Sequence, residues 1–571
     1  MNPIKTRTMT PIIECVPNYS EGRDMAVIDA IVGAIKSVEG IKVLDVDPGE
    51  ATNRTVVTFV GAPEPVLEAA FQGAKKAQEL IDMRQHHGAH PRSGATDVLP
   101  LIPVAGITLE ECAKLAKCLA ERLWKELGIP CYLYEAAAQT PERKNLAVCR
   151  EGEYEALPKK MEDPAKKPDF GGAWNEVAAK AGATNVGARN FLVAVNFNLN
   201  TTSTRRAMAV AFDVREKGRK AREGGSLTGK LLKDANGNQI WIPGTLKGCK
   251  AIGWYIDEYG IAQVSMNITD IDTTPLHVAF EEVSRAAAAR GLRVTGAEIV
   301  GLVPKKVLTE AGKFYLEKQQ RSLGISEVEI IKFAVKSMSL DDLKPFNPKE
   351  KVIEYLIADD KKGLVDMTLA GFIRETASES AAPGGGSISA AMGAAAAALA
   401  TMVANLSAHK RGWDDRWKEF SDVAEKGQAL VDRLLQLIDE DTAAFNRIMD
   451  VFSMPKGTPE EKAAREKAME EATIYAASVP LETMETSLKA LPLALEMALR
   501  GNPASASDAG VAALAAVAGI KGARLNVRIN CAGLQDKAPA EPLLARADAI
   551  VTEALELEAK VLEAVNSNIV L

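Results

Sequence analysis

Three of the five histidines lie within the run RQHHGAHPRSGATD, which spans residues 84–97. Histidine is the side chain whose ordinary pKa suits proton transfer near neutral pH. Glycine and proline interrupt the run, so it is predicted to form a loop rather than a helix. Two kinds of site suit such a loop: a catalytic site, in which a histidine moves protons, and a metal site.

The spacing of these histidines separates the two alternatives. His86 and His90 have the i, i+4 spacing of a zinc pair on a helix, but Gly88 and Pro91 argue against a helix there. No glutamate stands between the two histidines and no third ligand is evident, so we expect no metal site. The other histidines of the run suit structural roles with the ring bonded to the backbone. For His90 we favour catalysis, because Pro91 stiffens the segment and Arg92 places a cation beside it.

Two further polar segments have the character of a site. The turn VPNYSEG at 16–22 directly follows a predicted strand, and LDVDPG at 44–49 ends another strand and is followed by TNRT at 52–55. The alternation of side chains along a strand puts Asp45 and Asp47 on the same face. The alternative is ordinary turn chemistry, since Asn and Asp begin turns in most proteins. Three such segments beside one sheet favour a shared site.

The sequence around these segments predicts alternating strands and helices. In the first third, β-branched runs and amphipathic runs follow the order β-α-β-β-α-β. The strands are expected at 12–16, 42–46, 55–60 and 98–104, and the helices at 23–37, 65–83 and 109–127. This is the order of the ferredoxin-like arrangement, in which helices pack on one face of a sheet.

A second unit with the same order follows. Its strands are expected at 191–197, 252–255, 262–268 and 292–295, and its helices at 204–216 and 276–289. Residues 151–187 are rich in Lys, Pro and Gly and are predicted to form a loop, and residues 217–247 a long exposed hairpin or loop. Two such sheets side by side would leave a groove, which is a common location for a ligand.

Strand signals nearly stop after a polar connector at 358–363. Helical periodicity then predicts helices at 390–407, 413–452, 459–497, 507–523 and 542–567. Pro480 and Pro492 are expected to break or kink the third of these. We therefore predict a multidomain chain with two α/β ferredoxin-like subdomains and an all-α bundle. The predicted boundaries are 1–190 and 191–357 for the two subdomains, 358–365 for a linker and 366–571 for the bundle.

The composition and net charge of the chain argue against nucleic acid and anionic membranes as partners. The 571 residues carry a net charge of −7, with 47% hydrophobic and 25% charged residues, so no global positive charge draws nucleic acid or an anionic membrane. Residues 1–7 lack the apolar core of a signal peptide, and the apolar run 390–406 is mostly Ala and Gly, as expected of a packed soluble helix. Seven scattered cysteines suit reduced thiols in a cytoplasmic protein.

The helical half has two polar features of its own. PGGGS at 383–387 precedes an Ala-rich helix, and its glycines would let a ligand approach the helix N-terminus. The lysine spacing of a phosphate-binding loop is absent, so we expect no nucleotide. In the run Asp439-Glu440-Asp441, the apolar residues one turn before and one turn after Asp441 are Leu437 and Phe445, and they place Asp441 toward the bundle interior and Asp439 outward. The alternative is a solvated acidic turn.

Several of these segments together resemble known families. CVPNYSEG at 15–22, DVD with TNRT at 45–55, GAHPR at 88–92 and GEYEALP at 152–158 are similar to the glutamate formiminotransferases. The helical half, with AAPGGGS at 381–387, is similar to formiminotetrahydrofolate cyclodeaminase. The whole chain therefore resembles the fused bifunctional family, formiminotransferase-cyclodeaminase.

For the first half, the resemblance implies transfer of the formimino group from N-formimino-L-glutamate to the nitrogen at position five of tetrahydrofolate. His90 matches the catalytic histidine of the family, and Asp47 matches the acidic residue that holds or polarises the reacting groups. We expect Arg54 or Arg92 to bind a substrate carboxylate, since a guanidinium binds carboxylates bidentately. Folate is expected along the loop 171–182. The matched substrate-binding and folate-binding residues are Asn18, Gly171, Gly172 and Gly182.

For the second half, the resemblance implies closure of the formimino group onto the nitrogen at position ten, with loss of ammonia, to give 5,10-methenyltetrahydrofolate. Asp441 matches the proton acceptor of the family, and burial would raise its pKa enough for it to act as base and acid. The other expected substrate contacts are Gly384, Gly385, Gly386, Ser387 and Asp508.

The resemblance also implies partners. Neither step requires a metal, and a cytoplasmic homo-oligomer is expected. Family members carry folate as a polyglutamate, for which the candidate ligands are Lys159, Lys160, Lys166 and Lys167. The alternative for these lysines is a solvated charged surface. Two other functions stay open at this point: a single-activity glutamate formiminotransferase whose helical half only assembles subunits, and a non-enzymatic folate-binding scaffold.

Overall fold

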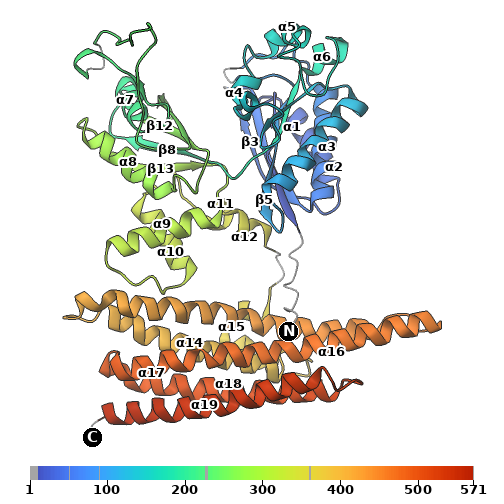
Figure 1. Ribbon diagram of the computed structural model, residues 1–571, viewed down its shortest axis with the longest axis vertical. Coiled ribbons are helices and arrows are strands. Elements are labelled where there is room, and N and C mark those ends of the chain that lie inside the picture. The colour runs from blue at the N-terminus through green and yellow to red at the C-terminus, as the bar shows by residue number, and fades with distance from the viewer. Residues whose placement is uncertain (1–10, 51, 89–90, 226–228, 359–361, 570–571) are drawn as a thin grey trace. The chain divides into compact units, whose positions relative to one another are not determined.

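The computed structural model describes residues 11–50, 52–88, 91–225, 229–358 and 362–569. The chain separates into two compact units, one made of Met1–Glu310 with Met338–Ala358 and the other of Ala311–Ser337 with Asp359–Leu571. The first unit is built on sheets and the second is mostly helical (Figure 1). This confirms the prediction of a multidomain chain with an α/β region followed by a helical region.

The first sheet has seven strands. Its antiparallel part runs in the order β3 (Lys42–Gly49), β4 (Arg54–Gly61), then β1 (Ile12–Cys15) with β2 (Asn18–Tyr19), then β5 (Thr96–Ala105). Both β1 and β2 lie between β4 and β5, so they act as one strand interrupted at Val16 and Pro17. Two parallel strands continue the sheet beyond β5: β7 (Thr184–Ala188) and β6 (Cys131–Glu135).

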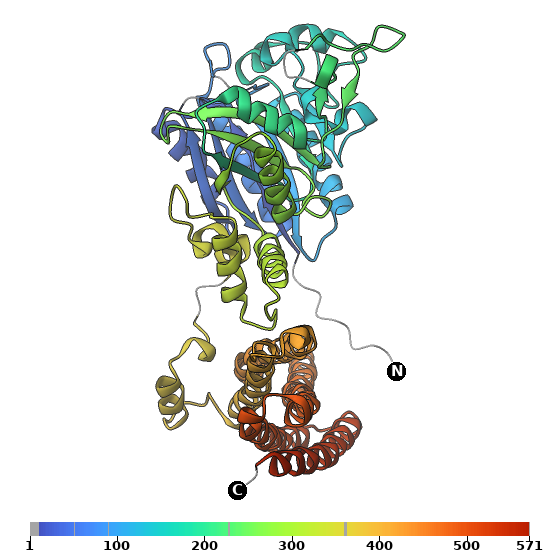
Figure 2. The same ribbon diagram turned by 90° about the vertical axis from the view of Figure 1, so that its left-hand side faces the viewer.

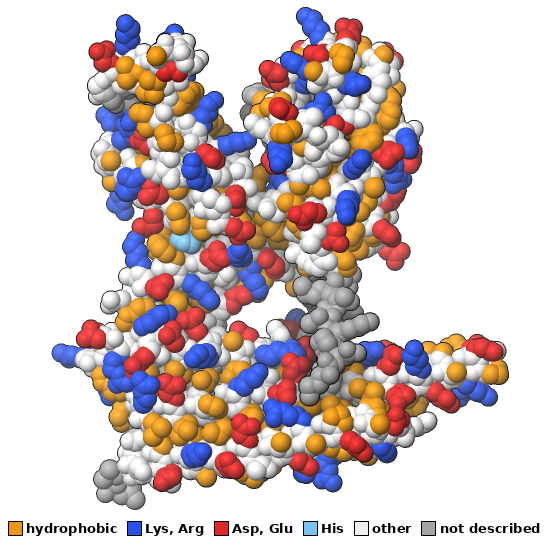
Figure 3. All heavy atoms as spheres, viewed as in Figure 1, with side chains coloured by type: hydrophobic (Ala, Val, Ile, Leu, Met, Phe, Trp, Pro, Cys, Tyr) orange, Lys and Arg blue, Asp and Glu red, His pale blue; other side chains and the backbone are white. Residues whose placement is uncertain are grey.

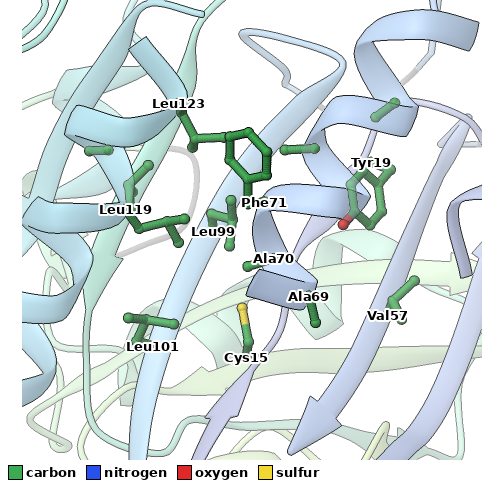
Figure 4. Packing of buried hydrophobic residues seen from close by; sticks show 14 of the residues in the cluster. Cys15, Tyr19, Val57, Ala69, Ala70, Phe71, Leu99, Leu101, Leu119 and Leu123 are labelled. Atoms are coloured by element: carbon green, nitrogen blue, oxygen red, sulfur yellow. The ribbon is translucent and has the colours of Figure 1, made fainter. Parts of the chain in front are cut away.

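Three helices cover one face of this sheet (Figure 1): α1 (Met25–Lys36), α2 (Pro63–Leu80) and α3 (Leu109–Leu127). Their apolar sides and the inward strand residues form one buried core. In Figure 4, Phe71 of α2 packs beside Leu123 of α3, with Leu99 of β5 close by. Burial of each such side chain contributes about 1.5–3 kcal/mol, which holds the strands in register against the helices.

The prediction of a loop over residues 151–187 is wrong. The segment after β6 forms short helices: η1 (Pro141–Lys144), α4 (Leu146–Cys149), η2 (Tyr154–Ala156), α5 (Leu157–Glu162) and α6 (Glu176–Ala181). Part of it covers the second face of the sheet, where Tyr132 and Tyr134 pack with Cys149 and Leu157. The helices are at most six residues long, too short for a helical period to show in the sequence.

The second sheet has four antiparallel strands in the order β11 (Cys249–Ile256), β12 (Ile261–Ile268), β8 (Val193–Leu199) and β13 (Val294–Val300). Helices α7 (Thr204–Val214) and α8 (Leu276–Ala288) pack against it. The predicted exposed hairpin is confirmed, since β9 (Arg219–Lys220) pairs with β10 (Trp241–Ile242). Four helices not predicted from the sequence follow: α9 (Lys305–Lys318), α10 (Glu327–Ser337), α11 (Pro348–Lys351) and α12 (Ile353–Ile357).

The helical unit contains the predicted long helices. They are α14 (Gly385–Ala408), α15 (Trp417–Phe452), α16 (Pro459–Leu488) and α17 (Ala490–Arg500), which divide the helix predicted at 459–497, and α18 (Ala506–Ala532) and α19 (Ala540–Asn568). The short helix α13 (Leu369–Thr376) was not predicted, and neither were the short turns η4 (Leu364–Asp366), η5 (Asp414–Arg416) and η6 (Pro503–Ser505). Figure 2 shows them nearly end on as a bundle. Helix α14 begins at Gly385, inside the glycine run, and Pro480 lies within α16 without ending it.

Small residues bring the bundle helices close together. A Cβ atom added to Gly519 of α18 would lie 2.8 Å from the carbonyl oxygen of Ser389 in α14, so only glycine allows this approach. Two spans, Gly385–Ala408 and Pro503–Ala532, are long and apolar enough to cross a membrane by length and composition. In the structure 61% and 56% of their most apolar windows are buried, and the two helices pack against each other.

Charged side chains of both signs are interspersed over the face of the molecule seen in Figure 3. No large area of that face carries a single sign of charge. This distribution agrees with the small net charge of −7.

Candidate active sites

Strand register brings the first group of candidate residues onto one face of the first sheet. Asp47 of β3 pairs with Val56 of β4, and Val56 pairs in turn with Asn18 of β2. Side chains at paired positions project from the same face of a sheet. Their strand neighbours Tyr19 and Val57 point into the core under the helices, so Asp47 and Asn18 project from the opposite face.

Asn18 has an unused acceptor in this position. The side chain is 6% exposed, its Nδ2 donates to the carbonyl of Val16 at 2.8 Å, and its Oδ1 is buried without a hydrogen-bond partner among the described residues. A buried acceptor left unpaired costs about 1–3 kcal/mol, so a ligand N–H at this point would be stabilised. Asn18 thus presents an unpaired acceptor on this face of the sheet, and its role as a substrate ligand stays a prediction.

Arg54 supplies positive charge on the same face. It lies on β4 two positions before Val56, so the two side chains share a face. Burial lowers the pKa of Arg54 to about 10, while the carboxylates of Asp97 and Asp47 favour its charged form. At that value the guanidinium stays protonated at neutral pH. Asp97 itself accepts from the backbone N–H of Ser93 at 2.9 Å and forms an ion pair with Arg150.

The histidine segment lies against the 52–55 turn. His86 is 7% exposed and its Nε2 lies 2.8 Å from the carbonyl oxygen of Asn53, which is the backbone-bonded role expected for it. The side-chain amide of Asn53 donates to the carbonyl of His87 at 3.0 Å. His90 lies outside the described residues, so its assignment depends on the sequence.

Arg92 binds carboxylates of the protein itself. Its guanidinium donates to both Glu155 oxygens at 2.9 and 2.7 Å and to Glu153 at 3.1 Å, and also to the carbonyl of His86 at 3.1 Å. The hydrogen bonds to Glu155 raise the pKa of Arg92. Because these partners occupy the guanidinium, the structure favours a structural role for Arg92 over binding a substrate carboxylate.

The predicted folate loop is divided in the structure. Gly182 has φ +70° and bridges Gly94, and a Cβ on Gly182 would lie 2.2 Å from the carbonyl oxygen of Ser93, so this end adjoins the histidine segment. At the other end, a Cβ on Gly171 would meet Pro168 at 2.5 Å and one on Gly172 would meet Trp124 at 3.3 Å. Helix α6 lies between the two ends. Gly182 thus contacts the histidine segment at Ser93 and Gly94, whereas Gly171 and Gly172 adjoin Pro168 and Trp124.

Trp174, an aromatic residue within the predicted folate loop, packs on a protein ring. Its ring centroid lies 6.1 Å from that of Tyr154, with the planes tilted by 58°. Both side chains adjoin the apolar cluster on the second face of the first sheet. The Trp174 ring is therefore packed against the protein itself.

The second candidate site lies where α14 begins. Ser387, the third residue of α14, is fully buried, and its hydroxyl lies 2.9 Å from Oδ2 of Asp441 in α15 and 3.1 Å from the carbonyl of Ile438. A Cβ on Gly386 would lie 2.0 Å from Oδ1 of Asp441, so the carboxylate approaches the helix N-terminus through a gap that only glycine leaves. Burial raises the pKa of Asp441, while the hydroxyl and backbone N–H of Ser387 lower it.

The neighbours of Asp441 correct part of the sequence interpretation. Asp441 faces α14 as expected, but Phe445, expected on the same buried face, is 40% exposed, and Ala444 is buried in its place. At 3.6 residues per turn, the positions three and four residues after Asp441 lie on either side of its direction, and the buried side here is that of Ala444. Asp439 accepts a hydrogen bond from the backbone N–H of Leu364 at 2.6 Å rather than only facing solvent.

Asp508 does not join this site. It lies in the first turn of α18, and the preceding Asn502 donates its backbone N–H to Ser407 near the end of α14. Ser387 and Ser407 are about 30 Å apart along α14 at 1.5 Å per residue. The helices α14 and α18 are antiparallel. The start of α18 therefore lies at the C-terminal end of α14, whereas Asp441 lies at the N-terminal end. Asp508 was predicted from the polar junction that precedes α18. Such junctions precede many helices, so this signal could not show which end of α14 Asp508 would meet.

Asn526 is a residue of this site that sequence reasoning missed. It lies in α18, where its Nδ2 donates to the carbonyl of Gly522 at 3.0 Å, and a Cβ on Gly385 would lie 3.3 Å from that nitrogen. Gly384, the N-cap residue of α14, supplies no side-chain cap. The only sequence signal is an asparagine within a largely apolar helix. Over the described ranges, no group of three or more His, Cys, Asp or Glu could hold a metal ion.

Comparison with known proteins covers nearly the whole chain. Residues 12–189 match the N-terminal subdomain of the formiminotransferase domain, residues 194–358 the formiminotransferase domain, and residues 368–549 the family described as formiminotransferase-cyclodeaminase. The chain is 43% identical to the formimidoyltransferase-cyclodeaminase of Mus musculus over 97% of its own length and 98% of that protein.

Relatives of each half also exist as separate proteins. The glutamate formimidoyltransferase of Streptococcus pyogenes serotype M1 is 41% identical over 54% of this chain and 94% of its own length. The methenyltetrahydrofolate cyclohydrolase of Methylorubrum extorquens is 38% identical over 35% of this chain and 97% of its own length.

Proposed function

The chain belongs to the formiminotransferase-cyclodeaminase family, and on that premise we propose which residues carry each of its two activities. It is a bifunctional folate enzyme of histidine degradation. It transfers the formimino group from N-formimino-L-glutamate to tetrahydrofolate, giving glutamate and 5-formiminotetrahydrofolate, and then cyclises this product to 5,10-methenyltetrahydrofolate with loss of ammonia. The observation that carries this function is the relationship to bifunctional enzymes over 97% of the chain.

The first step belongs to the sheet-built unit. The nitrogen at position five of tetrahydrofolate attacks the amidine carbon, and His90 accepts the proton that this nitrogen loses. His90 then returns the proton to the glutamate nitrogen as its bond to the carbon breaks, a contribution of about 10²–10⁴-fold in rate. Asp47 and Asn18 project from one sheet face beside Arg54, which supports their roles as ligands of the reacting groups and of a substrate carboxylate.

The second step belongs to the helical unit. The nitrogen at position ten attacks the carbon of the protonated formimino group and gives its proton to Asp441, which then returns this proton to the amino group as it leaves as ammonia. Burial raises the pKa of Asp441, as suits a carboxyl group that acts as base and then as acid. The backbone of Gly384 and Gly385 is accessible at the same helix N-terminus, whereas Gly386 is buried and makes room for Asp441.

Ser387 suits both protonation states of this carboxyl group. Its hydroxyl has one proton and two acceptors within reach, Oδ2 of Asp441 at 2.9 Å and the carbonyl of Ile438 at 3.1 Å. When Asp441 is ionised, the hydroxyl donates to it. When Asp441 is protonated, the carboxyl donates to the hydroxyl oxygen and the hydroxyl donates to Ile438. Neither state leaves a buried polar atom unpaired.

The bifunctional assignment is tested by stoichiometry. The full chain is supplied with N-formimino-L-glutamate and tetrahydrofolate, and glutamate, ammonia and 5,10-methenyltetrahydrofolate are measured together. We expect all three products in equal amounts. Glutamate without ammonia would favour a single-activity transferase with a structural helical half, and saturable folate binding with no product would favour a scaffold.

The folate tail is proposed to bind at a cavity of about 250 Å³ beside α5, which Lys159 and Lys166 border together with Glu151 and Asp163. Lys160 is not available for it, because its ammonium group donates to the carbonyl of Cys149 at 2.5 Å and is largely buried. We expect Lys159→Gln with Lys166→Gln to raise KM for polyglutamylated tetrahydrofolate and to leave KM for the monoglutamate unchanged. An equal effect on both would contradict this assignment.

Each sheet is interpreted as a ferredoxin-like core. The order β3, β4, β1 with β2, and β5, with α1 and α2 as crossovers, is supported by antiparallel pairing throughout. The order β11, β12, β8, β13 repeats it with α7 and α8. On this interpretation, β7 and β6 are additions to the first core.

A homo-oligomer in the cytoplasm is the proposed state of the chain. Helix α14 has no charged residue, yet Met392, Met402 and Leu406 are exposed on it, beside exposed Val511 and Leu514 of α18. A helix apolar on all sides is normally buried all round, which favours a second copy on this face. Leu514→Glu is expected to lower the mass found by light scattering, and an unchanged mass would contradict the proposed contact.

Six of the seven cysteines are buried and all are free, which suits a reducing compartment. Cell fractionation tests that location.

A further inference from the structure

Asn53 joins three segments of the proposed transferase site. Its Oδ1 accepts the backbone N–H of Gly22 at 3.0 Å, at the end of the segment that carries Asn18. Its Nδ2 donates to the carbonyl of His87 at 3.0 Å, and its own carbonyl oxygen lies 2.8 Å from Nε2 of His86. The side chain is 8% exposed, so these hydrogen bonds are shielded from competing water.

The ring of His86 is held in one tautomer by its two neighbours. Nε of Arg92 carries a hydrogen and lies 3.4 Å from Nδ1 of His86, so Nδ1 is the acceptor. Nε2 therefore carries the proton and donates it to Asn53. Burial lowers the pKa of His86, so the ring is neutral at pH 7. His86 is thus committed to the Asn53 contact and is not available as a proton acceptor at either nitrogen.

The backbone at this point also requires a close approach. Asn53 has φ +48°, a left-handed conformation in which Asn, Asp and Gly are the residues most often found. A Cβ on Gly88 would lie 2.2 Å from the carbonyl oxygen of Thr52, so glycine alone lets the two segments touch. Residues 52–53 and 86–88 therefore form one contact, which the Asn53 side chain extends to Gly22.

We infer that Asn53 is a positioning residue of the transferase site, which holds residues 86–88 and Gly22 at one point beside Arg54. This inference rests on the proposed function of the sheet-built unit. Asn53 does not itself react. It acts through the segment that leads to the catalytic histidine, and its hydrogen bond to His87 is the contact on which that placement depends. A displacement of about 1 Å at a reacting group costs on the order of 10²-fold in rate.

Two variants test this role. Asn53→Gly keeps the left-handed backbone and removes both side-chain hydrogen bonds. Asn53→Asp also tolerates that backbone and keeps an acceptor for Gly22, but it loses the donor to His87. Both are expected to lower kcat for formimino transfer by about 10²-fold, with KM changed much less. The cyclodeaminase rate of the same protein is expected to be unchanged, as is every rate in the control Asn238→Gly, which removes a side-chain bond in an exposed turn.

The outcomes separate the inference from the function. A wild-type chain without transferase activity would overturn the proposed function. An active wild type with full kcat in Asn53→Asp would overturn the inference, because the His87 contact would then be dispensable. A merely structural role would lower the amount of folded protein and leave kcat per folded molecule intact, which circular dichroism and active-site titration would reveal. That result would also overturn the inference.

Discussion

Ser387→Ala tests the proton chemistry of the helical site. The change removes the hydroxyl that lies 2.9 Å from Asp441 and leaves the backbone N–H of the same residue in place. A hydrogen bond to a charged group contributes about 1.5–3 kcal/mol, and about 1.4 kcal/mol corresponds to one pH unit in an ionisation. Because the ionised carboxylate loses this stabilisation, the pKa of Asp441 rises further above its ordinary value. With part of the loss recovered by water, we expect a rise of about one pH unit.

The direction of the kinetic effect follows from the role of Asp441 as base. Only the ionised form accepts the proton, so the acid limb of kcat/KM for cyclisation should move to higher pH by about one pH unit. The assay follows 5,10-methenyltetrahydrofolate formed from supplied 5-formiminotetrahydrofolate across the acid range. Ser389→Ala is the matched control, since Ser389 is a buried serine of the same helix that bonds the carbonyl of Gly385. An acid limb that stays in place, or moves to lower pH, would refute this reasoning.

Three further predictions concern the sheet-built unit. Arg54→Gln should raise KM for N-formimino-L-glutamate at least about tenfold, because a charged ligand of the carboxylate is lost, while KM for tetrahydrofolate stays constant; steady-state kinetics with each substrate varied will decide this. Arg92→Lys should lower kcat for transfer and the melting temperature, because the bidentate contact with Glu155 is lost, whereas equal melting curves would count against that role. Gly182→Ala should destabilise the unit by at least about 1 kcal/mol, because φ is +70° and Ser93 lies in the way, and denaturant unfolding measures the loss.

Elements with strong local signals were predictable from the sequence. Helix α3 spans 109–127 in both the prediction and the structure, because a capping box of Thr108 and Glu111 begins it and Gly128 in the left-handed region ends it. Strand β7 has no comparable signal. It is five residues long, and it exists because β5 and β6 pair with it on either side, which depends on chain segments far away in sequence.

The candidate sites show the same difference. The segments that carry Asn18 and Asp47 could be singled out by residue type, but their common face follows from the pairing of both with Val56. The sequence offered Arg92 as a ligand for substrate, and the structure shows it bound to Glu153 and Glu155. The sequence around Arg92 does not indicate its partners, because Glu153 and Glu155 lie about sixty residues later in the chain.

The central claim is that two separate sites perform two different proton transfers. The most direct measurement compares His90→Ala with Asp441→Asn in the full chain, each given N-formimino-L-glutamate with tetrahydrofolate and, separately, 5-formiminotetrahydrofolate. We predict that Asp441→Asn releases glutamate and accumulates 5-formiminotetrahydrofolate without ammonia. We predict that His90→Ala releases no glutamate but cyclises the supplied intermediate at the wild-type rate. Loss of both activities in either folded variant would contradict the account.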